Sequence, residues 1–326
     1  MMARSAPQPV LPLVAGLLAA CAAALVSGCA ADEPVAPAPS STGAAGEGGT
    51  LTWAVADPVR TLDPLLARTR AEQIVSRQVH EPLIESLASP FGEARRRRGL
   101  ARSARPAGDA SVWVLKLRGG IRFQDGEVFD AAAVQANAER WLATAAGRDL
   151  LPDLLAVDAP TPASVRFILS APDPSLPRRL ASPRLGIVSP RALDAGLGSV
   201  GTGPFTGTGT GAFEVREAAP DRLLLARNTG WWGAPLRLGP ALDQVILRIE
   251  PSGPVRVALL DSGDVQLADQ LDADQARFVR RNPLLTTIPG PPGEWLGAER
   301  AVRGVDSATE IPSLAAAWLT TLNVPD

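Results

Sequence analysis

The stretch VWVLKLRGGIRFQDGEVFD, residues 112–130, shows how secondary structure alternates along this chain. Val112–Leu117 is an almost continuous apolar run, which predicts a strand buried on both faces. Gly119–Gly120 turns the chain, and Asp125–Gly126 is typical of a hairpin turn rather than of a ligand contact. Asp130 predicts a helix N-cap. Strand, turn and helix in such short succession indicate an α/β chain with short connections.

Outside this stretch the pattern continues without an internal repeat. Strands are predicted at 51–55, 165–169, 212–216, 222–226, 245–249 and 265–267. Helical spacing runs over 68–85, where Pro82 suggests the end of the helix, and further helices are predicted over 130–142 and 255–260, the last closed by Gly263. The polar run 91–108 predicts a loop. The mixed order of strands and helices again indicates the α/β class.

The composition excludes several classes of function. The chain has 326 residues, 46% of them hydrophobic, and a formal net charge of −2, which gives no reason to expect a nucleic-acid partner. Cys21 and Cys29 both lie near the start, and His80 is the only histidine. A folded core without cysteines has no zinc cluster of cysteines and no cysteine nucleophile, and a single imidazole excludes any site that needs two. No Ser/His/Asp set is recognisable in the sequence. We therefore expect no enzyme, no catalytic residue, no metal and no cofactor.

The amino-terminal region predicts export. An apolar run, 11–26, follows Arg4 and ends in Val26-Ser27-Gly28-Cys29, which resembles the lipobox of bacterial lipoprotein precursors. The resemblance implies a signal peptide over 1–28 and a lipid anchor on Cys29, holding the protein at the extracytoplasmic face of the cell membrane. An ordinary secretory leader with an incidental cysteine is the alternative. Residues 29–48, rich in Ala, Pro, Ser and Gly, predict a flexible tether.

Short sequence motifs along the chain, called words below, resemble those of one protein family. Residues 48–53 (GGTLTW) and 61–64 (TLDP) are similar to the mature start of family 5 extracellular solute-binding proteins, the peptide and nickel receptors of ABC importers. Further matching words follow in the family's order at 79–83 (VHEPL), 99–101 (GLA), 113–126, 129–141, 187–190 (IVSP), 201–205 (GTGPF), 227–233 and 260–268. The resemblance implies the type II periplasmic-binding-protein fold, with mixed sheets and flanking helices.

The sequence departs from the family after residue 268. Family members continue into a further lobe, whereas here 282–293 is a short Pro/Gly-rich stretch, followed by 299–305 and 311–319, which resemble the family's closing strand and helix. We therefore predict a first lobe over 49–269 with a subdomain at about 60–186 inserted, a shortened segment over 270–326 that replaces the second lobe and closes the chain, and poor affinity for any solute.

The resemblance also implies candidate ligand-binding residues. They are Asp63, His80, Arg184, Trp231 and Trp232. Each has a structural alternative: a turn for Asp63, helix packing for His80, a surface ion pair for Arg184 and apolar contacts at a domain edge for the two tryptophans.

The family implies a substrate-binding lipoprotein that captures an oligopeptide or a similar small polar solute and delivers it to ABC permease subunits. Two alternatives stay open. One is a surface scaffold or interaction module without a transport role, derived from such a receptor by loss of a lobe. The other is the product of a decaying gene.

Overall fold

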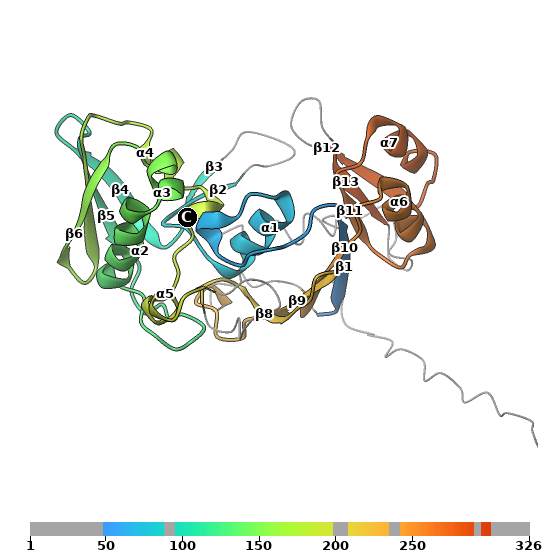
Figure 1. Ribbon diagram of the computed structural model, residues 1–326, viewed down its shortest axis with the longest axis horizontal. Coiled ribbons are helices and arrows are strands. Elements are labelled where there is room, and N and C mark those ends of the chain that lie inside the picture. Colours follow the sequence, from blue (N-terminus) through green and yellow to red (C-terminus); the bar gives the residue numbers. More distant parts are fainter. Residues whose placement is uncertain (1–47, 88–94, 198–207, 235–241, 290–294, 301–326) are drawn as a thin grey trace, which may run out of the picture. The chain divides into compact units, whose positions relative to one another are not determined.

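The computed structural model describes residues 48–87, 95–197, 208–234, 242–289 and 295–300 (Figure 1). Within these ranges the strands form a seven-stranded, a four-stranded and a two-stranded sheet. The predicted signal peptide, the anchor Cys29, most of the tether, the word at 201–205 and the helix at 311–319 lie outside the described residues.

The seven-stranded sheet has a parallel centre and antiparallel edges. Strand β1 (Thr50–Val55) lies between β10 (Gln244–Ile249) and β11 (Leu267–Asp269) and is parallel to both. The antiparallel strands are β8 (Phe213–Ala218) and β9 (Arg222–Arg227) beyond β10, and β12 (Leu285–Pro289) and β13 (Trp295–Arg300) beyond β11. Residues distant in the sequence therefore build one sheet.

The four-stranded sheet is antiparallel and comes from one continuous part of the chain. Its order is β4 (Ala101–Ala107), β5 (Val112–Leu117), β7 (Ser164–Leu169) and β6 (Leu154–Thr161). Helix α2 (Ala131–Ala143) packs on β6 and β7, and α3 (Ala145–Leu150) packs on α2. Strands β2 (Ile84–Leu87) and β3 (Arg95–Arg98) form the small sheet.

The remaining helices are short. They are α1 (Arg70–Val79), α4 (Leu176–Arg179), α5 (Pro190–Ala195), α6 (Gly253–Ser262) and α7 (Ala273–Val279), with 3-10 turns η1 (Pro64–Leu66) and η2 (Pro183–Leu185).

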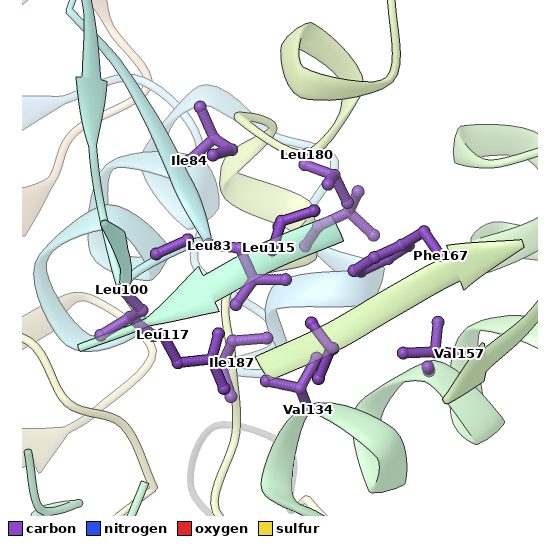
Figure 2. Packing of buried hydrophobic residues seen from close by; sticks show 14 of the residues in the cluster. Leu83, Ile84, Leu100, Leu115, Leu117, Val134, Val157, Phe167, Leu180 and Ile187 are labelled. Carbon is purple, nitrogen blue, oxygen red and sulfur yellow. The ribbon is translucent and has the colours of Figure 1, made fainter. Parts of the chain in front are cut away.

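Burial of apolar side chains holds these elements together. Figure 2 shows the cluster in which Leu115 and Phe167 from the four-stranded sheet pack near Val134 of α2. A second cluster, including Leu51 and Val245, belongs to the seven-stranded sheet, and a third lies with α6 and α7. Burying each large apolar side chain contributes about 1.5–3 kcal/mol.

Several predictions around the opening stretch are confirmed. Asp130 caps α2, since its Oδ1 accepts hydrogen bonds from the backbone N–H groups of Ala132 (2.9 Å) and Ala133 (3.1 Å). Gly126 has φ +89° in the turn after Asp125, and Gly263 ends α6 in the left-handed region. Only glycine adopts these backbone angles without strain.

Other predictions are wrong. Val112–Leu117 is not buried on both faces: Trp113, Leu115 and Leu117 are buried, whereas Lys116 is exposed. One face of this sheet is open, so apolar residues on it do not signify burial. The run 91–108 is not a loop, because β3 and β4 lie in it. β4 is an edge strand, and an edge strand tolerates polar side chains.

The predicted boundaries also move. Helix α1 ends at Val79, three residues before the end that Pro82 suggested, because the chain becomes extended at His80. The stretch 282–293 contains strand β12, whose Thr286, Thr287 and Ile288 are β-branched and favour a strand. The strand predicted at 299–305 corresponds to β13, which begins at Trp295 and is described as far as Arg300. The division into lobes stays a prediction; β12 and β13 pair into the same sheet as β1.

Candidate functional site

The carboxyl ends of the three parallel strands mark the candidate site. Because β10, β1 and β11 run in one direction, their carboxyl ends lie at the same edge of the sheet. Ligands of open α/β sheets bind outside such an edge. The segment that leaves β1 there, residues 56–69, is called the β1–α1 loop below.

Glu72 fixes the backbone of the β1–α1 loop. Its carboxylate accepts hydrogen bonds from the backbone N–H groups of Arg60 (3.1 Å), Arg68 (2.8 Å) and Thr69 (3.0 Å). Burial by itself opposes ionisation of Glu72, but these donors hold its pKa below the usual value. In turn, the Glu72 N–H donates a hydrogen bond to Oγ1 of Thr69, which completes a capping box. The loop is therefore held in one conformation.

Asp63 and Arg184 meet in the middle of the loop. Asp63 caps η1 by accepting the Leu65 N–H at 3.0 Å, and it forms an ion pair with Arg140 of α2. Arg184 of η2 donates from Nε (3.2 Å) and Nη2 (2.9 Å) to the carbonyl oxygen of Leu65. The two residues thus approach one turn from different elements. For Asp63 the turn role is observed; contact with a solute stays a prediction for both.

His80 lies where the chain leaves α1. It is buried, and its Nε2 is 2.9 Å from Oγ1 of Thr208. Burial, together with the nearby charge of Arg140, lowers the pKa of His80 to about 3. The imidazole is therefore neutral at physiological pH, and its Nδ1 has no hydrogen-bond partner among the described residues.

The two predicted tryptophans converge on Glu81, a residue that sequence reasoning missed. Trp231 donates its indole N–H to Oε1 of Glu81 (3.2 Å), and Trp232 donates to Oε2 (2.7 Å). The hydroxyl of Thr210 also donates to Oε2, at 2.7 Å. The Arg118 guanidinium lies 5.0 Å from the Trp232 ring centroid, a cation–π distance. Both indole N–H groups are thus committed inside the protein, and only the rings can contact another molecule.

Glu81 joins parts of the chain that belong to different clusters. Trp232 packs against the clusters of both large sheets. Desolvation raises the pKa of Glu81 to about 7, although its three neutral hydrogen-bond donors and Arg118 favour the charged form. A carboxyl group that changes charge near neutral pH therefore lies at the junction between the sheets.

Arg256 and Asp269 lie at the carboxyl ends of the parallel strands and were also missed. Arg256 is 3% exposed and donates to four backbone carbonyl oxygens, those of residues 250, 251, 269 and 270. Asp269 accepts the Ala56 N–H at 3.2 Å and lies 3.3 Å from Nε of Arg70. Desolvation raises the pKa of Asp269 to about 6. An arginine within an apolar helix was the available sequence signal.

The described ranges contain neither a cluster of metal ligands nor a membrane-spanning helix. Within them, no group of three His, Cys, Asp or Glu side chains is arranged to hold a metal ion. No helix in those ranges is both long and apolar enough to cross a membrane.

The structure thus places the five predicted residues in two neighbouring sets. Asp63 and Arg184 belong to the β1–α1 loop and its support, and Trp231 and Trp232 belong to the Glu81 cluster. His80 directly precedes Glu81 in the sequence. Its pKa is lowered in part by the charge of Arg140, which is the ion-pair partner of Asp63.

Comparison with known structures shows that this mixed α/β fold is similar to that of periplasmic binding proteins. The chain matches DppA from Helicobacter pylori, solved in complex with the peptide STSA, with a TM-score of 0.65 at 19% identity, over 74% of this chain and 50% of DppA. It matches AgaA from A. tumefacien R10, solved with agropinic acid, with a TM-score of 0.64 at 25% identity, over 73% and 47% of the two chains.

The family follows from the sequence comparison. A family model described as "Bacterial extracellular solute-binding proteins, family 5 Middle" matches residues 97–299 of this chain. The chain belongs to this family, as the ordered words predicted. It is 29% identical to the glutathione-binding protein GsiB of Escherichia coli (strain K12) over 245 residues, 73% of this chain and 45% of GsiB. The chain thus spans about half the length of the relatives it matches.

Proposed function

We propose that this chain acts as the substrate-binding component of an ABC importer, capturing an oligopeptide or a similar small polar solute outside the cell for delivery to permease subunits. Binding without catalysis is the activity we assign to it. The proposal is supported by its family and by the relatives, which are named as binding proteins for glutathione and dipeptides.

The observation that carries the proposal is the fixed β1–α1 loop at the carboxyl edge of the sheet. Three backbone N–H groups bound to Glu72 hold it, while Leu66 in its middle is 47% exposed. A surface that is already ordered loses little conformational entropy when a ligand binds. A rigid loop with an exposed apolar side chain is thus suited to binding.

Thermal unfolding of the purified chain tests the proposal. We expect at least one compound from a panel of short peptides, glutathione and agropinic acid to stabilise the folded state. At a free concentration of about 100 Kd the gain is ~2.7 kcal/mol, which raises Tm by roughly 5–10 °C. Leu66→Ser should weaken this effect, whereas Leu155→Ser, which alters a leucine 59% exposed on β6, should preserve it. A panel without any effect at millimolar concentration contradicts the proposal.

We also propose that Cys29 is acylated and holds the protein on the extracytoplasmic face of the cell membrane. The support is the sequence Val26–Cys29 after an apolar leader. In cells that express the full chain, we expect Cys29→Ala to move the protein from the membrane fraction to the soluble fraction. The matched variant Cys21→Ala should leave it in the membrane fraction. Mass spectrometry that finds an unmodified amino terminus in the wild-type protein would rule out the anchor.

A further inference from the structure

The carboxylates around the β1–α1 loop are all engaged within the protein. Asp57 accepts hydrogen bonds from the Arg70 N–H and from Nε2 of Gln270, and Asp269 forms an ion pair with Arg70. Asp63 is paired with Arg140, and Glu72 binds backbone N–H groups. Asp63 and Asp269 are thus paired with arginines, whereas Asp57 and Glu72 are bound by uncharged N–H donors. Such bonds do not cancel the charge of a carboxylate, so the two remaining carboxylates offset two of the positive charges described next.

Three arginines at the same loop have no such partner. Arg60 and Arg68 are exposed, and Arg184 is half-buried. Among the residues that the structure describes, none of the three forms an ion pair with a carboxylate. The whole chain has a net charge of −2, so this local excess of positive charge is not a general property of its surface.

The loop brings the three arginines into one region. The backbone N–H groups of Arg60 and Arg68 bind the two oxygens of the single Glu72 carboxylate, at 3.1 and 2.8 Å. The carbonyl oxygen of Leu65, between them in sequence, holds the guanidinium of Arg184 through Nε and Nη2. These bonds leave Nη1 of Arg184 available, and a guanidinium edge binds carboxylate well.

We propose that Arg60, Arg68 and Arg184 form an anion-binding surface and that the captured solute is an acidic peptide or a comparable small molecule with two or more carboxylates. This inference rests on the proposed function and specifies its substrate class. Leu66 supplies apolar contact beside the charges. A basic surface also raises the association rate of an anionic solute.

The position of Arg184 favours a small solute over an anionic membrane surface. Its guanidinium is half-buried and is held by two hydrogen bonds to Leu65. A flat lipid surface reaches flexible, fully exposed basic side chains, whereas a small carboxylate can reach a partly buried one. The three arginines together therefore fit a discrete ligand.

Isothermal titration of the purified chain tests the inference with two probes, the tripeptide Glu-Ala-Glu and its uncharged-side-chain counterpart Gln-Ala-Gln with an amidated carboxyl end. We expect the acidic probe to bind at least about tenfold more tightly, and less so as salt concentration rises. Arg68→Gln and Arg184→Gln should each weaken its binding about tenfold, and Arg184→Lys should weaken it less. Arg105→Gln, which alters an exposed arginine on β4, is the matched control and should have no effect.

The outcomes separate this inference from the proposed function. Equal binding of both probes, or binding of the acidic probe that Arg68→Gln does not change, overturns the inference and leaves the binding function intact. Arg68 is the decisive position because its side chain makes no hydrogen bond within the described ranges, so its replacement should not disturb the fold. Sedimentation with anionic phospholipid vesicles, without binding of Glu-Ala-Glu, overturns the inference in favour of a membrane contact. If neither these probes nor the wider panel bind, both proposals fail.

Discussion

Replacing Arg256 by alanine is expected to lower the free energy of unfolding by about 3–5 kcal/mol, the usual loss when one partner of a buried charged network is removed. The Arg256 side chain is buried and donates to carbonyl oxygens at the ends of both β10 and β11. Without it, four acceptors lose their donor, and each buried acceptor without a partner costs about 1–3 kcal/mol, less where water enters. Asp269 also loses the favourable charge of Arg256.

Chemical denaturation of the purified chain measures this effect. Arg256→Lys should recover part of the stability, because an ammonium group keeps the charge but cannot reach all four carbonyl groups as a planar guanidinium does. The matched control is Arg277→Ala on α7, where an exposed arginine pairs with exposed Asp274; a change below about 0.5 kcal/mol is expected there. If Arg256→Ala and Arg277→Ala had equal effects, the carbonyl network would not be important for stability.

The second expected result is that stability falls as the pH rises from about 4.5 to 7. Glu81 has a pKa of about 7 in the folded chain, against 4.5 ordinarily, chiefly because of desolvation. Over this window the folded state keeps a proton that the unfolded state has lost, so the folded state binds more protons and stability decreases with pH. Asp269, raised to about 6 from 3.8, acts in the same direction at lower pH. His80, lowered to about 3 from 6.5, acts in the opposite direction up to about pH 6.5, because there the unfolded state binds the proton. The two raised carboxyl groups together outweigh this one histidine. For Glu81 the change is about 2 kcal/mol, allowing for screening of a partly exposed residue.

Urea unfolding of the wild-type chain and of Glu81→Gln at pH 6 and pH 7 isolates Glu81, since Asp269 and His80 titrate alike in both proteins. Glu81→Gln removes the titration, so the loss of stability between the two pH values should become small. Glu139→Gln, an exposed position on α2, should retain the wild-type difference. An equal change of stability from pH 6 to pH 7 in the wild-type chain and in Glu81→Gln would show that the donors around Glu81 offset its desolvation.

Local sequence signals predicted the secondary structure where one face of an element is buried. The caps at Asp130 and Gly263 were predictable because they depend only on neighbouring residues. The strand β4 was not, because its alanines, arginines, serine and proline give no apolar alternation and its pairing with β5 is what makes it a strand. The family, in turn, was predictable from ordered words, which the match over residues 97–299 confirms.

The partners of the candidate site were less accessible to sequence reasoning. Trp231 and Trp232 were noticed as a pair, but Glu81 lies 150 residues before Trp231 and nothing local connects them. Arg184 was identified as a cation near the ligand, yet its two bonds to the Leu65 carbonyl depend on how η2 packs against η1. Long-range hydrogen bonds follow from the tertiary fold and leave no periodic pattern in the sequence.

The position of β1 in the middle of the seven-stranded sheet constrains the order of assembly. Thr50 pairs with Gln244, and Trp53 pairs with Leu267, so the first strand must wait for segments made about 200 residues later. The four-stranded sheet draws all its strands from residues 101–169 and can form before those segments leave the ribosome. Closing long loops carries an entropic cost and slows folding. Strand β1 therefore stays without its sheet partners during most of synthesis, when a chaperone or a protease has access to it.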